Sequence, residues 1–179
     1  MEREGGILMI GKRWPAIFLV GLLATACAAS EEPSQPAPDA ATSTEAASAG
    51  YDPTADPFMD LQQTVSEATR SDRRILLEVG GEWCIWCHYW EDFLAVDAAV
   101  KEALTGAFVV LKVNYSPEND NSEFLSQYPE IPGYPHFFVL DTDGSFLHSQ
   151  GTAVLELGES YEPKKVLEFI RQWGPKPTA

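Results

Sequence analysis

Residues 75–88 read Ile-Leu-Leu-Glu-Val-Gly-Gly-Glu-Trp-Cys-Ile-Trp-Cys-His, an apolar run that leads through two glycines to two cysteines. The run at residues 75–79 stands between two arginines and the two glycines, which favours a buried β-strand. After the cysteines, apolar side chains recur at helical spacing and predict a helix that ends near Gly106. The sequence therefore places Cys84 and Cys87 between a strand and the start of a helix.

Cys84 and Cys87 have the spacing of a redox pair. A helix N-terminus offers free N–H groups and the positive end of the helix dipole, and both favour a thiolate at Cys84. Cys87 then lies one turn further on, close enough to form a disulfide with Cys84. Thiol–disulfide exchange needs this arrangement, because one thiolate attacks a disulfide and a second thiol resolves the mixed disulfide.

Two other kinds of site use the same residues. A zinc half-site needs further ligands, for which His88, His136 and His148 are the histidines available. Cys-x-x-Cys followed by His88 is also the attachment motif of c-type haem. Such a haem normally has a distal ligand as well, for which Met59 is another candidate. The motif alone leaves these hypotheses open, and the elements around it favour the redox pair, with no cofactor.

Helices and strands alternate along the rest of the folded region, which predicts an α/β fold class. Pro57 suits the first turn of a helix, and the Asp-Thr-Asp-Gly sequence at 141–144 favours a hairpin because Asp-Gly tolerates positive φ. Residues 129–135 are a Pro- and Gly-rich loop. The other predicted elements are a helix from residue 57, a strand at 108–113, a helix at 118–128, strands at 136–140 and 145–150, and a last helix from residue 163.

The first 26 residues have the pattern of a secretory signal peptide. Lys12 and Arg13 precede an apolar run at 16–26 that ends in small residues, and that run is too short to span a membrane. The Leu-Leu-Ala-Thr-Ala-Cys sequence that ends at Cys27 favours a lipoprotein signal with lipidation of that cysteine, ahead of ordinary secretion or an uncleaved anchor. Residues 27–55, rich in Ala, Pro and Ser, are expected to form a flexible tether to a membrane.

The composition limits the remaining choices. The chain has 179 residues and is 45% hydrophobic, which suits one globular domain, predicted at 56–174 with a short tail at 175–179. Twelve Lys and Arg face 27 Asp and Glu, giving a formal net charge of −15 that argues against a nucleic-acid partner. Nothing in the sequence requires more than a monomer, and the acidity is expected to keep the domain soluble.

Residues 75–173 resemble the thioredoxin-like superfamily, especially exported members similar to the C-terminal domain of the thiol:disulfide interchange protein DsbD. Three features carry the resemblance: the sequence at 76–84 that ends in Trp83-Cys84, the Ile-Pro-Gly-Tyr-Pro loop at 131–135, and the hairpin at 141–144. The resemblance implies a central mixed β-sheet flanked by helices. The sequence departs from thioredoxin itself in having Ile85-Trp86 between the cysteines and His88 after them.

The resemblance also implies roles for the residues at the cysteine pair. Cys84 is expected to be the nucleophile and the more exposed thiol, and Cys87 the more buried resolving thiol. Glu78 stands six places before Cys84, where thioredoxins often carry a buried acid that assists the resolving thiol. Alternation along the strand leaves open whether Glu78 has this role or faces water.

A second group of residues is expected to contact the substrate. Pro135 is expected to follow a cis peptide bond beside the cysteine pair, and the backbone of Tyr134 to pair with a substrate segment. Trp83 matches the tryptophan that precedes the first cysteine in the family, and Trp86 offers an apolar contact for a partner. Trp90, one helical turn later, is expected to lie in the core.

These observations lead to one main hypothesis and two alternatives. The main hypothesis is an exported thiol–disulfide oxidoreductase of the bacterial envelope that acts on protein disulfides or dithiols, works as a reductase and takes electrons from a membrane partner. One alternative is a c-type haem or metal-binding lipoprotein that uses Cys84, Cys87 and His88. The other is a non-catalytic thioredoxin-like interaction module in which the disulfide only stabilises the fold.

Overall fold

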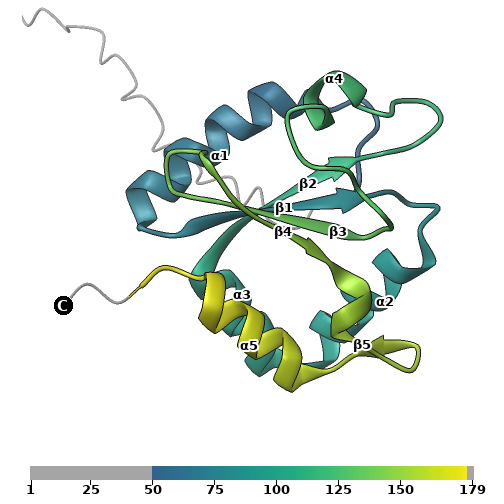
Figure 1. Cartoon of the computed structure of the whole chain (residues 1–179), viewed down its shortest axis with the longest axis vertical. Helices are drawn as coiled ribbons and strands as arrows, with labels where there is room; N and C mark the ends of the chain where they lie inside the picture. The colour runs from purple at the N-terminus through teal and green to yellow at the C-terminus, as the bar shows by residue number, and fades with distance from the viewer. Residues whose placement is uncertain (1–49, 177–179) are drawn as a thin grey trace, which may run out of the picture. The chain divides into compact units, whose positions relative to one another are not determined.

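A four-stranded β-sheet forms the centre of residues 50–176, the part of the chain that the computed structural model describes. β1 (Arg74–Gly80) lies between β2 (Phe108–Asn114), its parallel partner, and β3 (His136–Leu140), its antiparallel partner. β4 (Phe146–Gly151) pairs antiparallel with β3 at the edge of the sheet. The order β2-β1-β3-β4 confirms the predicted α/β fold with a mixed sheet (Figure 1).

Helices cover both faces of this sheet (Figure 1). α1 (Pro57–Ser71) and the short α4 (Ser122–Leu125) lie on one face, and each contributes to the apolar cluster there. The other face is covered by α2 (Ile85–Val96), α3 (Ala98–Ala107) and α5 (Pro163–Trp173), which share a second apolar cluster. The sheet is therefore the middle layer of three, which is why its inner strands are apolar on both sides.

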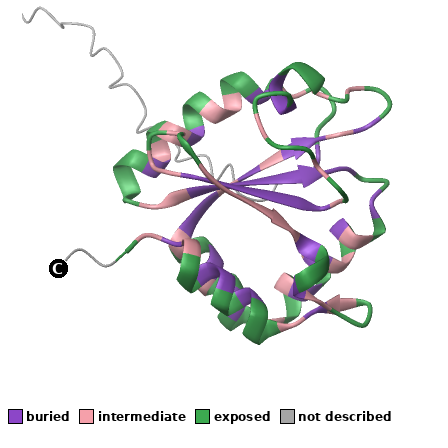
Figure 2. Cartoon of the chain, viewed as in Figure 1, coloured by how far each residue is buried: buried purple, intermediate pink, exposed green. Residues whose placement is uncertain are grey.

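β1 is buried on both faces, as the purple strand in Figure 2 shows. Successive side chains of a strand point to opposite faces. Leu76 accordingly packs in the cluster beneath α2, α3 and α5, while Leu77 packs in the cluster beneath α1. Glu78, two places after Leu76, is on the face covered by α2, directly behind the cysteines.

Two predicted helices differ from those in the structure. The single helix expected after the cysteines is divided at Asp97, whose side chain accepts a hydrogen bond from Val100 N (3.0 Å) and so caps a second helix, α3. The helix expected at 118–128 is only the four residues of α4. Instead, Asn119 Oδ1 accepts a hydrogen bond from Asn121 N, Asn121 Nδ2 donates to the Asn114 carbonyl, and Asn114 Nδ2 donates to the Asn119 carbonyl. These contacts stabilise loop structure where helix was expected.

A further segment was not predicted. A 3₁₀ helix (Thr152–Leu155) follows β4, and the two-residue strands β5 (Glu156–Leu157) and β6 (Ser160–Tyr161) form a small hairpin. The hairpin places Tyr161 in the core against α2, where its ring meets Trp90 edge-on at a centroid distance of 5.0 Å. Elements this short show no hydrophobic period, so sequence patterns do not detect them.

The folded part begins before residue 56. Residues 50–55, which the sequence analysis assigns to the tether, are described by the structure, and Tyr51 among them is only 6% exposed. The predicted leader at 1–26, Cys27 and the tether up to residue 49 lie outside the described residues, as do residues 177–179 of the tail. Among residues 50–176, none of the helices has the length and apolar character needed to cross a membrane.

Truncation of a β1 side chain tests the two-sided burial of this strand. Leu77 is fully buried, so Leu77→Ala should lower the free energy of unfolding by about 2–5 kcal/mol through lost contacts and a cavity. Leu157→Ala is the matched control because Leu157 is 60% exposed, and it should change that free energy by less than about 0.5 kcal/mol. Urea unfolding of the oxidised protein measures both values, and equal effects would contradict this packing.

Candidate active site

Cys84 and Cys87 form a disulfide at the N-terminus of α2, with their Cα atoms 5.2 Å apart. Cys84 is the N-cap residue: its backbone is extended, and its Sγ accepts a hydrogen bond from Cys87 N at 3.1 Å. The first N–H groups of a helix have no partner within the helix, so this contact satisfies one of them. A helix N-terminus stabilises a thiolate, so the Cys87 N–H is in a position to favour ionisation of Cys84 once the disulfide is reduced.

Both sulfurs are buried. Cys84 is 3% exposed and Cys87 is 1% exposed, so Cys84 is the more exposed of the two by a small margin only. The reason is an aromatic cover: Tyr51, Trp86 and Tyr134 pack around the two cysteines. A partner that reaches Cys84 has to displace part of this cover.

The Tyr134–Pro135 peptide bond is cis, as expected, and lies in the loop that precedes β3. The carbonyl of Pro135 accepts a hydrogen bond from Thr152 Oγ1 at 2.7 Å, which fixes the loop to the 3₁₀ helix. The ring of Tyr134 lies edge-on to Trp83 and stacks on Tyr115, with centroid distances of 5.5 and 4.8 Å. This loop therefore brings Tyr134 to the disulfide, next to Trp83.

Glu78 is buried behind the disulfide, at 1% exposure. Its Oε1 accepts a hydrogen bond from the Tyr51 hydroxyl (2.7 Å), and its Oε2 accepts one from Trp90 Nε1 (3.1 Å). Of the two orientations that the sequence left open, the water-facing one is wrong. Both faces of β1 are covered, so a side chain on either face of this strand at Glu78 is shielded from solvent.

The surroundings of Glu78 favour its neutral form. Burial first, and then the nearby Glu91 carboxylate, raise the pKa of Glu78 from an ordinary 4.5 to about 7. Lys112 and the two hydrogen bonds oppose this rise. Lys112 is beside Glu78 in the register of β1 and β2, and its Nζ lies 2.6 Å from Glu91 Oε1. Two carboxyl groups, those of Glu78 and Glu91, therefore lie near a single ammonium group, that of Lys112.

The comparisons with known proteins agree with this geometry. Residues 55–142 match the family described as thioredoxin-like. The chain carries a thioredoxin-like domain. Its fold is similar to that of a disulphide isomerase from Xylella fastidiosa, at 22% identity and a TM-score of 0.57, covering 68% of this chain and 94% of that chain. It is also similar to the oxidised C-terminal domain of DsbD from Neisseria meningitidis, at 21% identity and a TM-score of 0.51, covering 70% and 99%.

Two curated relatives match part of the chain by sequence. The thiol:disulfide interchange protein DsbD of Colwellia psychrerythraea is 28% identical over 93 residues, which are 51% of this chain and 15% of that protein. DsbD of Actinobacillus pleuropneumoniae is 25% identical over 101 residues, 56% of this chain and 17% of that protein. The chain thus spans less than a fifth of the length of these relatives, and its Cys84–Cys87 pair lies in a domain similar to the C-terminal domain of DsbD.

The tryptophans around the pair occupy different environments in the thioredoxin-like domain. Trp83 is 54% exposed, and its Nε1 donates to the Tyr115 carbonyl at 2.6 Å. Trp86 is partly buried between the disulfide and the core, with its ring edge-on to Tyr161. Trp90 is fully buried, as predicted. Trp83 is thus the most accessible of the three for contact with another molecule.

Tyr51 is the site residue that the sequence analysis missed. It is the only aromatic residue between positions 28 and 57, in a stretch otherwise typical of a tether, and that isolation was the available signal. Its hydroxyl donates to Glu78, and its backbone N–H donates to Glu82 Oε1 at 3.0 Å. Desolvation and the Glu78 carboxylate raise the pKa of Tyr51 well above its ordinary value, so the phenol stays protonated.

The three histidines do not gather at the cysteines. His88 is exposed and its Nε2 lies 2.8 Å from the Glu82 carbonyl oxygen, while His136 is buried against Ser149 Oγ. His148 stacks on Trp173 at a centroid distance of 3.9 Å. Within residues 50–176, no three His, Cys, Asp or Glu side chains are grouped in a way that could hold a metal ion.

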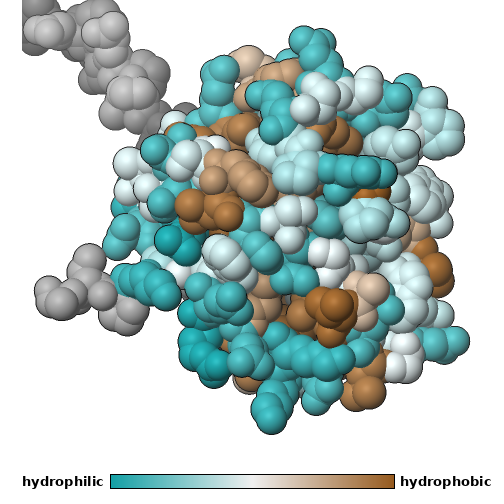
Figure 3. Space-filling view, in the orientation of Figure 1, coloured by the Kyte–Doolittle hydropathy of each residue, from teal (hydrophilic) through white to brown (hydrophobic). Residues whose placement is uncertain are grey.

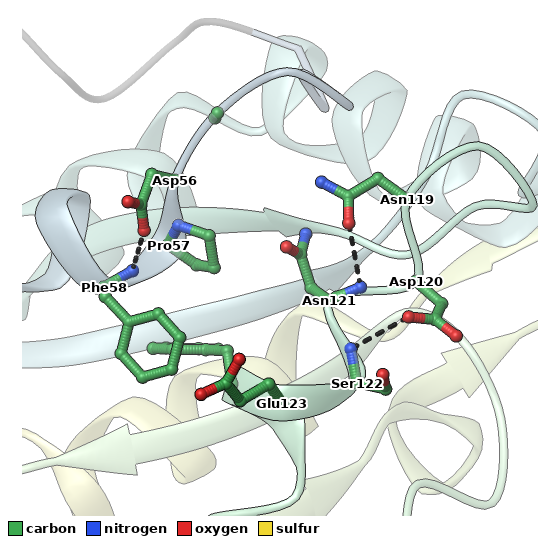
Figure 4. A pocket seen from close by; sticks show the side chains of 10 residues that line it. Asp56, Pro57, Phe58, Asn119, Asp120, Asn121, Ser122 and Glu123 are labelled. Atoms are coloured by element: carbon green, nitrogen blue, oxygen red, sulfur yellow. Dashed lines mark hydrogen bonds between the residues drawn. The ribbon is translucent and has the colours of Figure 1, made fainter.

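The surface hollows of residues 50–176 include the following two. One is lined by residues 55–58 and 119–124, where Asp56 and Asp120 cap backbone N–H groups, and it includes neither cysteine (Figure 4). The other is lined by Trp83, Tyr115 and residues 116, 117 and 120, and it also includes neither cysteine. The face in Figure 3 is largely hydrophilic, with separate apolar patches.

The pKa of Glu78 predicts a pH dependence of stability. The unfolded chain loses this proton near pH 4.5, whereas the folded protein keeps it until about pH 7, so folding is progressively disfavoured as the pH rises between these values. The free energy of unfolding should fall by about 3 kcal/mol across this window. In Glu78→Gln, that part of the slope should disappear. Urea unfolding of the oxidised proteins from pH 4 to pH 8 checks this, and parallel curves would contradict it.

Proposed function

We propose that this protein is an exported thiol–disulfide oxidoreductase that reduces protein disulfides in the bacterial cell envelope. The observation that carries the proposal is the Cys84–Cys87 disulfide at the start of α2, between a buried acid and a cis-proline loop. In the reduced protein, the Cys84 thiolate attacks a substrate disulfide and forms a mixed disulfide. Cys87 then gives its proton to Glu78 and attacks Cys84 Sγ. Two electrons pass to the substrate, whose two sulfurs leave as thiolates and take up protons from Glu78 and from solvent, and the Cys84–Cys87 bond re-forms.

The position of Glu78 supports its role as proton acceptor. A base is effective when its pKa lies near the working pH, and the pKa of Glu78 is about 7. Tyr51 connects the acid to the cysteines, because its hydroxyl binds Glu78 while its ring packs in the same cluster as both sulfurs. The resolving thiol is buried, so it has few other groups to take its proton.

The aromatic residues around the disulfide are proposed to bind the partner protein. Trp83 and Tyr134 form an edge-to-face pair next to the cysteines, and Trp83 is largely exposed. Trp86 offers a further apolar contact. The backbone at Tyr134 and Pro135 is proposed to pair with the substrate segment that carries the disulfide, which would align that disulfide with Cys84.

The proposal also includes the direction of electron transfer and the location of the protein in the cell. The similarity to DsbD domains supports thiol–disulfide exchange with protein partners in the cell envelope, and electrons are proposed to come from a membrane partner. The leader at 1–26 would direct export, and lipidation of Cys27 would hold the domain on a membrane through the tether. The domain is proposed to act as a monomer and without a cofactor.

Equilibration with defined glutathione ratios tests the redox function in the intact chain. Cys84 and Cys87 fall on one tryptic peptide, residues 75–101, separate from Cys27, so alkylation and mass spectrometry count their thiols alone. We expect a reversible two-electron transition closer to about −270 mV than to about −120 mV. Cys87→Ser should retain a mixed disulfide with glutathione, whereas Cys84→Ser should form none.

Each other outcome of this titration is informative. A transition near the oxidising end would overturn the reductase direction. A cysteine pair that never exchanges would overturn the enzyme function itself and favour a haem-binding, metal-binding or purely structural role.

Lipidation is tested separately by growing cells with a labelled fatty acid. The wild-type chain should incorporate the label, because the thiol of Cys27 is the proposed attachment atom. Cys27→Ser should incorporate none, and Cys84→Ser, which keeps Cys27, is the matched control. Label in Cys27→Ser, or no label in the wild type, would contradict the proposed lipid anchor.

A further inference from the structure

Tyr51 is held at the candidate active site by three separate contacts. Its hydroxyl donates to Glu78 Oε1 at 2.7 Å, and its backbone N–H donates to Glu82 Oε1 at 3.0 Å. The Lys112 ammonium lies 5.6 Å from the centre of its ring, within the range of a cation–π contact. At 6% exposure, this residue from the segment before α1 is part of the buried site.

Gly80 allows the Tyr51 hydroxyl to approach the resolving cysteine. A Cβ atom at this position would lie 2.7 Å from the Tyr51 hydroxyl oxygen and 2.5 Å from Cys87 Sγ. Both atoms therefore border the space that the absent side chain leaves free. The hydroxyl thus touches the acid on one side and lies beside the sulfur of Cys87 on the other.

We propose that Tyr51 is a positioning residue for the resolving step, where its hydroxyl holds the Glu78 carboxyl and stays bonded to it as the Cys87 proton arrives. This inference rests on the proposed function. No bond to Tyr51 forms or breaks in the step: Cys87 loses a proton, Glu78 gains it, and the phenol keeps its own.

The chemistry of the two hydrogen-bond partners of Glu78 explains why a tyrosine serves here. The indole N–H of Trp90 can only donate, so it can bind the carboxylate or the carbonyl oxygen of the acid, but it cannot accept the proton that the acid carries. A phenol hydroxyl both donates and accepts, so Tyr51 can donate to the carboxylate and accept from the carboxylic acid. Tyr51 therefore keeps Glu78 bonded in both protonation states, which a phenylalanine cannot do.

Other groups also shift the pKa of Glu78, so the test variant has to leave them unchanged. The Glu91 carboxylate on α2 opposes its ionisation, and the Lys112 ammonium on β2 favours it. Tyr161 on β6 is a neutral phenol near it, and Cys87 is the proton donor itself. Tyr51→Phe leaves all four in place, and also keeps the ring beneath Lys112 and the backbone bond to Glu82.

The test is the resolving step of the intact chain with oxidised glutathione. The reduced protein is mixed with oxidised glutathione, and the reaction is quenched with acid at a series of times. The mass of the 75–101 peptide then distinguishes the glutathione adduct at Cys84 from the Cys84–Cys87 disulfide. In the wild type, the rate at which the adduct decays should increase with pH, and the midpoint of this pH profile should be set by the pKa of Glu78. In Tyr51→Phe, that midpoint should rise by about one pH unit, the size expected for the loss of one hydrogen bond to a charged group.

Two comparisons separate positioning from a general effect on the fold. Formation of the adduct by Cys84 should keep its wild-type rate in Tyr51→Phe, which a loosened fold would not allow. Tyr128→Phe is the matched control: it removes another partly buried phenol hydroxyl, whose ring stacks on Phe138 on the opposite face of the sheet, and it should keep the wild-type midpoint. In a Glu78→Gln background, adding Tyr51→Phe should leave the resolving rate unchanged.

The outcomes distinguish this inference from the function on which it rests. An unchanged midpoint in Tyr51→Phe, or an equal shift in Tyr128→Phe, overturns the role of Tyr51 alone. An additive effect of Tyr51→Phe in the Glu78→Gln background overturns it as well. A wild-type chain that never forms the glutathione adduct overturns the proposed function and, with it, this inference.

Discussion

One carboxyl group buried in an apolar strand sets the requirements for the rest of the site. Burying a carboxyl group is costly unless it is hydrogen-bonded or neutral, and Glu78 sits in the central strand with both faces covered. Tyr51 and Trp90 supply its hydrogen bonds from two other elements, while Lys112 balances the charge on the neighbouring strand. The segment before α1, α2 and β2 therefore each place one partner beside this group.

The sheet register explains why the remaining parts of the site meet. β3 runs antiparallel to β1, so the start of β3 lies beside the end of β1, and Val79 pairs with His136. The cis-proline loop ends one residue before His136, and Cys84 follows four residues after Gly80. Two segments about fifty residues apart in sequence thus reach the same edge of the sheet. The position of Tyr134 in the aromatic cover is a consequence of this register, whereas Tyr51 reaches the cover from the segment before α1.

The sequence predicted those parts of the fold that have a strong local pattern. The apolar run of β1, the cysteine spacing and the Tyr134-Pro135 loop each carry their information within a few residues. The direction of Glu78 could not be predicted, because alternation is uninformative in a strand that is buried on both faces. Tyr51 was missed for a different reason: its partners are 27 and 31 residues away, and its neighbours have the composition of a tether. Composition describes a segment on average, and a single anchoring side chain does not change that average.

The electrostatics of the site bear on the direction of electron flow. A disulfide is a strong oxidant when its reduced form is stabilised, so groups that favour the Cys84 thiolate move the pair towards oxidation of its partners. The N–H of Cys87 acts in this sense. Against it, Glu78 and Glu91 lie behind the pair with one ammonium, that of Lys112, between them. A further negative charge on sulfur is unfavourable next to the Glu91 carboxylate, and next to Glu78 when it is ionised, which supports the proposed reductase direction.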